Sequence, residues 1–132
     1  MIVLDTHTLL WWASGDEAQL SAAAAQAIEA ELHGGQIVVS SISAWELAML
    51  VAKGRVILSM DIGEWLSVAG QIEAVSFASV DNEIAVKSTE LPGEFHKDPA
   101  DRIIVATARK LAAPLVTADE KIRAYPHVRT IW

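Results

Sequence analysis

Short apolar runs alternate with longer stretches of helical spacing along this chain. Five runs rich in β-branched residues predict strands: residues 2–4, 37–39, 75–77, 115–117 and 128–132. The longer stretches carry apolar residues at helical intervals and predict helices: residues 21–32, 43–53, 62–71, 79–88 and 98–111. Shorter helices are expected after Asp5 and Ala118. Strands that alternate with helices in this way predict an α/β fold with a parallel sheet.

The length and composition fit a single folded domain over residues 1–132. Of its residues, 52% are hydrophobic and 20% are charged, which is typical of a globular chain with a sizeable core. No apolar run is long enough to span a membrane, so no membrane partner is expected. The lack of cysteine and of a secretory signal favours a reducing cytoplasm. A net charge of −7 means that binding of nucleic acid needs local basic patches or bound cations.

Acidic residues stand where predicted strands end and helices begin. Asp5 follows the first predicted strand, and Asp119 follows the fourth. Glu46 lies at the start of the helix after the second strand, and Asp98 and Asp101 lie at the start of the helix before the fourth strand. Ligands of parallel α/β sheets bind at the carboxyl ends of the strands, so we expect these acids to gather there. Carboxylates at one sheet edge repel each other, and a divalent cation removes that conflict. Oxygen ligands without cysteine favour Mg²⁺ or Mn²⁺.

Helix capping offers an ordinary explanation for each acid taken alone. Asp98 suits the cap of a helix, Pro99 its first position and Asp101 its third, where an acid favours the helix dipole. Ser43 and Glu46 have the spacing of a capping box. However, a cap can equally be Ser, Thr or Asn. An acid at each of four separate helix starts therefore favours a shared metal site.

Together these motifs resemble the PIN domain, and in particular the VapC toxins of bacterial toxin–antitoxin pairs. The matching residues extend through nearly the whole chain: Asp5-Thr6, Ser43-x-x-Glu46, Asp98-Pro99-x-Asp101-Arg102-Ile103-Ile104-x-Ala106-x-Ala108 and Thr117-x-Asp119. The resemblance implies a three-layer α/β fold, with a central, mostly parallel sheet flanked by helices. It implies an endoribonuclease that uses Mg²⁺, or Mn²⁺ as a substitute, to activate water for attack on an RNA phosphodiester. It also implies a cognate antitoxin as partner and a homodimer.

The resemblance assigns roles to the acids by position. The family's four acids correspond to Asp5, Glu46, Asp101 and Asp119, which are expected to be catalytic and to hold the metal. Asp5 and Asp101 are expected as direct ligands, and Glu46 as a ligand or as the residue that orients the water. Asp119 would complete the site or hold a second ion. Asp98 has no place among the four and is expected to be a more distant metal ligand or only a cap.

Other polar and aromatic residues carry weaker expectations. Thr117 and Ser43 are expected to offer hydroxyls near the metal ligands, and Arg102 to contact phosphate. Because adjacent helical residues cannot both face one core, either Trp11 or Trp12 should meet a partner or lie half exposed. The histidines lack ligand spacing and are expected on the surface or in loops: His7, His33, His96 and His127. At His7 the PIN family often has Asn.

Three other functions fit parts of the pattern. A phosphoacceptor receiver domain has about this length and an acidic Mg²⁺ pocket, but it needs an acidic pair near the first strand and a Lys where Asp119 stands. A phosphatase of the haloacid dehalogenase type needs two acids two residues apart, whereas Asp5 is followed by Thr6 and His7. A non-catalytic binding protein would use the acids only as caps. Metal titration with and without Asp5 separates this last function from an enzyme.

Overall fold

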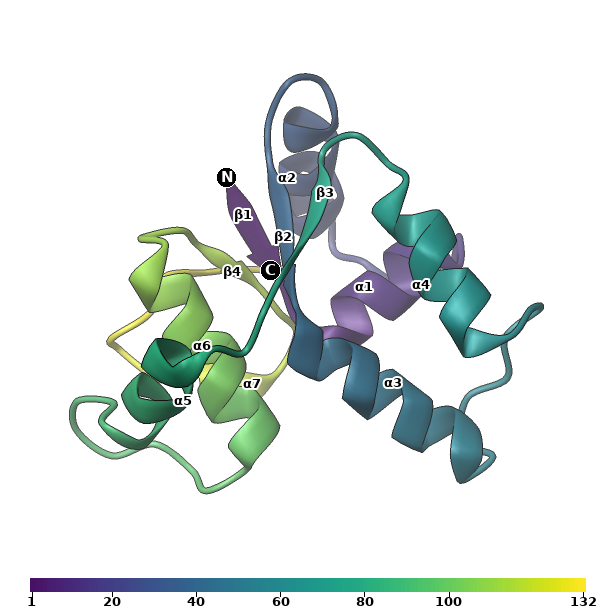
Figure 1. Ribbon diagram of the computed structural model, residues 1–132. Helices are drawn as coiled ribbons and strands as arrows, with labels where there is room; N and C mark the ends of the chain where they lie inside the picture. Colours follow the sequence, from purple (N-terminus) through teal and green to yellow (C-terminus); the bar gives the residue numbers. More distant parts are fainter.

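The computed structural model describes all 132 residues, Met1–Trp132. At its centre is a five-stranded sheet in which all neighbouring strands are parallel, in the order β3-β2-β1-β4-β5. The strands β1, β2, β3 and β4 are labelled in Figure 1. The strands are β1 (Ile2–Leu4), β2 (Ile37–Ser40), β3 (Val75–Ala78), β4 (Leu115–Val116) and β5 (Thr130–Ile131). Each lies where an apolar run predicts it, so the predicted α/β fold with a parallel sheet is confirmed.

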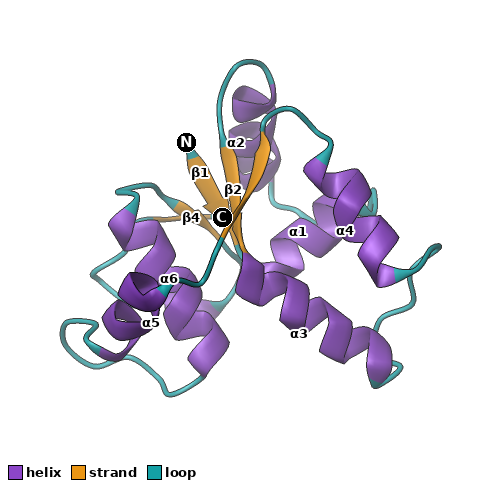
Figure 2. Cartoon of the chain, viewed as in Figure 1, coloured by secondary structure: helices purple, strands orange, loops and turns teal.

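Seven α-helices and one 3₁₀ turn connect the strands, and Figure 2 shows the strands lying between groups of helices. The helices are α1 (Thr6–Ala13), α2 (Ala22–Leu32), α3 (Ser41–Ala52), α4 (Ile62–Gly70), α5 (Asn82–Thr89), α6 (Pro99–Lys110) and α7 (Glu120–Arg123). The 3₁₀ turn covers Glu17–Gln19. None of the helices combines the length and the apolar character needed to cross a bilayer.

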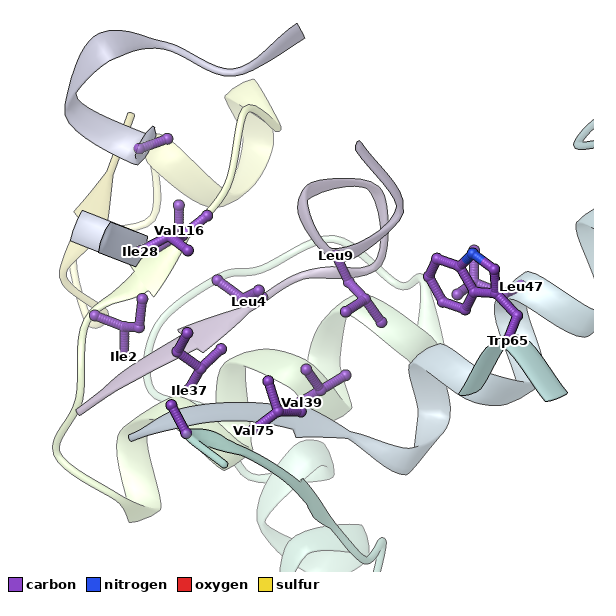
Figure 3. Packing of buried hydrophobic residues seen from close by; sticks show 12 residues of the cluster. Ile2, Leu4, Leu9, Ile28, Ile37, Val39, Leu47, Trp65, Val75 and Val116 are labelled. Carbon is purple, nitrogen blue, oxygen red and sulfur yellow. The ribbon is translucent and has the colours of Figure 1, made fainter. Parts of the chain in front are cut away.

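The strands divide the hydrophobic core into two clusters because successive side chains point to opposite faces of a sheet. Ile2 and Leu4 of β1 lie in one cluster with Ile28 of α2 and with side chains of α1, α3 and α4 (Figure 3). Val3, between them, lies in the other cluster with Ile104 of α6 and with side chains of α5 and α7. Helices therefore cover both faces of the sheet, which gives the expected three layers. Burial on both faces is also why the central strands β1 and β4 are apolar throughout, whereas the edge strands β3 and β5 carry Ser76 and Thr130.

Two helices begin at positions other than those predicted. The third helix, α3, starts two residues earlier than expected because the side chain of Ser40, at the end of β2, caps it. Ser43 and Glu46 consequently lie inside α3 and do not form the predicted capping box. The fifth helix, α5, starts three residues later than expected, since Asp81 caps it through the backbone N–H of Ile84 at 2.9 Å.

The strand order reverses next to β1, and this reversal locates the site. From β1 the chain builds β2 and β3 on one side and later returns to add β4 and β5 on the other. The carboxyl ends of β1 and β4 lie side by side, with Leu4 paired to Val116. Ligands of parallel sheets bind where the order reverses in this way. The order also differs from the 2-1-3-4-5 arrangement of flavodoxin-like folds, which argues against a receiver domain.

Candidate metal centre

One cavity of about 470 Å³ gathers all five acids that the sequence singles out. Its acidic lining residues come from the chain segments that follow β1, β2 and β4 and from the start of α6: Asp5, Glu46, Asp98, Asp101 and Asp119. The rest of the lining is Thr6, His7, Trp11 and Ala118, with no lysine or arginine. The cavity therefore concentrates negative charge at the carboxyl edge of the sheet.

Asp5 is the most firmly held of these acids. It caps α1, and its Oδ1 accepts a hydrogen bond from the backbone N–H of Thr8 at 2.9 Å. The hydroxyl of Thr117, after β4, donates to its Oδ2, so this hydroxyl lies beside a predicted metal ligand, as expected from the sequence. Thr8 in turn donates its own hydroxyl to the carbonyl of Val116 at 3.1 Å. Asp5 therefore caps a helix and lines the cavity, and its carboxylate is held by donors from α1 and from the segment after β4.

Glu46 reaches the cavity from the second turn of α3. The hydroxyl of Thr6 donates a hydrogen bond to its Oε1 and lies 2.9 Å from the hydroxyl of Ser43. Ser43 therefore contacts Thr6 and not an acid. Thr6 is a residue that sequence reasoning missed, although a hydroxyl directly after Asp5 was a possible signal. Burial raises the pKa of Glu46, the hydrogen bond from Thr6 opposes this rise, and the negative charge of Asp98 adds to it.

The first turn of α6 presents two acids with different surroundings. Asp98 is exposed and caps the helix, because its Oδ1 accepts the backbone N–H of Asp101 at 2.9 Å. Asp101 is the third helical residue, and only 21% of its side chain is exposed. Burial raises the pKa of Asp101 to about 7, and the negative charges of Asp98, Asp119, Glu46 and Asp5 contribute further. Asp101 is therefore the acid on which the crowding of charge acts most strongly.

His96 lies in the loop before α6, where a loop histidine was expected, but its ring is mostly buried beside Asp101. Its Nε2 is 3.1 Å from Oδ2 of Asp101, and this buried nitrogen makes no aligned hydrogen bond. The ring packs edge-on against Phe95, with 4.5 Å between the ring centroids. The structure thus adds His96 to the surroundings of Asp101, which its sequence position did not indicate. The other three histidines are exposed.

Asp119 caps the short helix α7 and connects to Asp5 through one hydroxyl. Its Oδ1 accepts the backbone N–H groups of Lys121 at 2.8 Å and Ile122 at 3.1 Å. Its own N–H donates to the hydroxyl of Thr117 at 3.0 Å, and that hydroxyl donates to Asp5. Its second carboxylate oxygen has no hydrogen-bond partner and is available to a ligand.

Arg102 does not take the predicted role of a phosphate contact. Its Nε donates to the carbonyl of Ser88 at 2.8 Å, and its Nη1 donates to the carbonyls of Phe95 at 3.1 Å and His96 at 3.3 Å. The guanidinium therefore ties the loop between α5 and α6 to the start of α6. Its sequence position beside Asp101 was misleading because neighbours on a helix point in different directions.

The donor chemistry of the cavity fits a hard divalent cation. Five carboxylates supply oxygen ligands, no cysteine is present, and two of the acids have a raised pKa that a nearby cation would reverse. No three acidic or histidine side chains already stand close enough to share one ion. Mg²⁺ usually keeps several water ligands and needs only one or two carboxylates from the protein, so the spacing of these acids is compatible with such an ion.

Comparisons with known proteins agree with this geometry. A profile of the PIN domain matches residues 2–128. The chain is 38% identical to Ribonuclease VapC22 of Mycobacterium tuberculosis over 133 residues, which cover 99% of this chain and 98% of that protein. The fold is similar to a crystal structure of VapBC2 from Rickettsia felis bound to a promoter DNA fragment (TM-score 0.70, 18% identity, 98% of this chain and 97% of that one). It is also similar to a toxin–antitoxin complex from Klebsiella pneumoniae (TM-score 0.65, 25% identity, 97% and 95% covered). With this sheet, this acidic cavity and these relatives, the chain belongs to the PIN-domain family, among proteins of the VapC type.

Proposed function

We propose that this protein is a metal-dependent endoribonuclease and the toxin of a toxin–antitoxin pair. The observation that carries the proposal is the cavity where Asp5, Glu46, Asp98, Asp101 and Asp119 meet. Family membership and the relative named as a ribonuclease support RNA as the substrate. The cytoplasm stays our predicted compartment, because that is where the proposed substrate is found.

We assign the metal to Mg²⁺, with Mn²⁺ as a substitute, because all the charged donors are carboxylates. Asp5 and Asp101 would hold the ion directly, and Asp119 would complete the site through its free oxygen or hold a second ion. When bound, the cation supplies Lewis-acid chemistry: it makes water more acidic and offsets negative charge on the phosphodiester. We assign Asp98, which is exposed and uses Oδ1 to cap α6, a role as a more distant metal ligand or as a cap only.

The protein's own side chains orient the acids and handle the proton. Thr117 and the backbone of Thr8 hold the Asp5 carboxylate in one orientation, so little reordering is needed on binding. Glu46, whose pKa is raised by burial, is suited to accept a proton from the attacking water or to orient it. The hydrogen bond from Thr6 holds the Glu46 carboxylate in place for this role.

We propose a cognate antitoxin and a second copy of this chain as protein partners. The toxin–antitoxin complex from Klebsiella pneumoniae supports the antitoxin, and so does an apolar groove of about 550 Å³ between α1 and α4. Trp12, Leu58, Met60 and Trp65 line that groove, and Val68 beside them is 51% exposed. An antitoxin segment would place apolar residues there and direct a cation at the acids. Light scattering that detects only monomer at micromolar concentration would argue against the homodimer.

The test of the activity is cleavage of cellular RNA by the purified protein. We expect cleavage with Mg²⁺ or Mn²⁺, no cleavage with EDTA, and no cleavage by Asp5→Asn or Asp101→Asn in the presence of Mg²⁺. Circular dichroism must show that both variants are folded, because both acids are helix-start residues. Full activity of either variant would contradict the site assignment. Unfolding of Asp101→Asn would instead favour a purely structural role for that acid.

A further inference from the structure

An aromatic group forms the non-acidic side of the cavity. Trp11 and His7, both on α1, line the cavity together with the acids. Their ring centroids are 5.6 Å apart and their planes are inclined by 47°. The ring of Trp132, at the end of the chain, lies 5.9 Å from Trp11 on a plane inclined by 53°. The Trp11 ring is therefore held between two others but is not stacked face to face on either.

Packing within the two core clusters does not account for Trp11. The neighbouring Trp12 packs against the core cluster on one face of the sheet, together with Trp132. Trp11 belongs to neither core cluster, although it is one of the largest apolar side chains in the molecule. This is the division between adjacent helical residues that the sequence predicts. Trp11 is half-buried, and the part of its ring that lines the cavity is left for contact with something other than the core.

The charge of the cavity indicates what that contact is. Five acids and no lysine or arginine line it, so no protein cation there offsets the charge of an RNA backbone. A metal ion attracts mainly the phosphate that it contacts. The phosphates of the neighbouring nucleotides are repelled by the remaining carboxylates. Stacking of a base on an aromatic ring adds binding energy without requiring positive charge. Trp11 and His7 are the aromatic side chains in the lining that can provide this contact.

We propose that Trp11, flanked by His7, is a stacking subsite for one unpaired base next to the scissile phosphate. This inference rests on the proposed ribonuclease activity and names a residue that binds the substrate beside the reacting phosphate. A base inside a duplex is already stacked on both faces and cannot use the subsite. The subsite therefore contributes to binding only where the base beside the scissile phosphate is unpaired.

The first test separates binding from chemistry. The substrate is a short single-stranded RNA that spans a cleavage site mapped with the wild-type enzyme in Mg²⁺. We expect Trp11→Leu to raise KM by about tenfold to a hundredfold with kcat changed much less, and Trp11→Phe to lie between the two. Trp45→Leu is the matched control, because Trp45 is 57% exposed and lies outside the cavity. An unchanged KM in Trp11→Leu, or an equal rise in both leucine variants, would overturn the proposal.

The second test uses the RNA, so it does not depend on how any variant folds. Each base near the cleavage site is removed in turn to give a series of abasic substrates for the wild-type enzyme. We expect one abasic position to raise KM by about tenfold or more, and the same position to have little effect in Trp11→Leu. If no single position matters for the wild type, the subsite does not exist. If the wild type cleaves no RNA at all, it is the proposed function that has failed.

Discussion

Removing the charge of Asp101 should make the metal-free protein more stable. In the folded chain, burial and four neighbouring carboxylates raise the pKa of this side chain from 3.8 to about 7. Between those two values the unfolded chain has released a proton that the folded chain still holds. Stability contributed by this residue therefore falls as the pH rises from about 4 to about 7 and stays low above that. Asp101→Asn removes the ionisable group and with it this loss.

The size of the effect follows from the same pKa values. Each pH unit between them corresponds to about 1.36 kcal/mol, so the ceiling is roughly 4 kcal/mol above pH 7. The side chain is 21% exposed, and solvent reduces the repulsion. As the third residue of α6, the charged acid also gains about 0.3–1 kcal/mol from the helix dipole, which asparagine forfeits. We expect a net gain of about 1–3 kcal/mol at pH 8 and nearly none at pH 4.

Urea unfolding in EDTA at a series of pH values measures this difference directly. Glu64→Gln is the matched control, because Glu64 is also the third residue of its helix, α4, but is exposed. That variant should be unchanged or slightly less stable at every pH. Adding Mg²⁺ should then stabilise the wild type and not Asp101→Asn, since only the wild type keeps the proposed ligand.

Two results would refute this reasoning about Asp101. A variant no more stable than the wild type at pH 8 would mean that the acidic cavity imposes no electrostatic cost on the folded chain. A gain of equal size at pH 4 and pH 8 would mean that the effect comes from packing and not from ionisation. Either result would remove the physical reason for placing a cation at this site.

Three further substitutions test separate features of the structure. Asp98→Ser keeps a helix cap and should retain at least about a tenth of the RNA cleavage rate, whereas Asp101→Ser should be folded and inactive. Complete loss of cleavage in both variants, with unchanged melting temperatures, would show that Asp98 is a metal ligand. Arg102→Lys should lower the free energy of unfolding in urea by about 2 kcal/mol, because an ammonium group cannot reproduce the contacts to three carbonyls. Ala112→Gly should raise it by about 1 kcal/mol without altering cleavage, because Ala112 has a φ of 51°; a loss of stability would contradict this.

The sequence by itself determined the features that depend on residues close together in the chain. Short runs rich in apolar and β-branched residues predicted all five strands. The signal was clearest for the inner strands β1, β2 and β4, because they are buried on both faces. The caps formed by Asp5 and Asp98 could also be predicted, since each bonds a backbone N–H only three residues away. That four helix openings carry acids was enough to suggest a shared cation site.

Tertiary structure alone decided how those acids are held. Ser40 starts α3 early, so Glu46 is not part of a capping box but is bonded to Thr6, 40 residues before it. Thr117 holds Asp5 across 112 residues, and the place of His96 beside Asp101 depends on the loop that Arg102 ties down. A pKa near 7 for Asp101 likewise needs burial and the charges of Asp5, Glu46 and Asp119, which three other segments of the chain bring to the cavity. Hydrogen bonds and electrostatic interactions depend on distances in space, which the fold sets, and not on separation along the chain. Local sequence patterns therefore locate the acids but do not show which groups surround them.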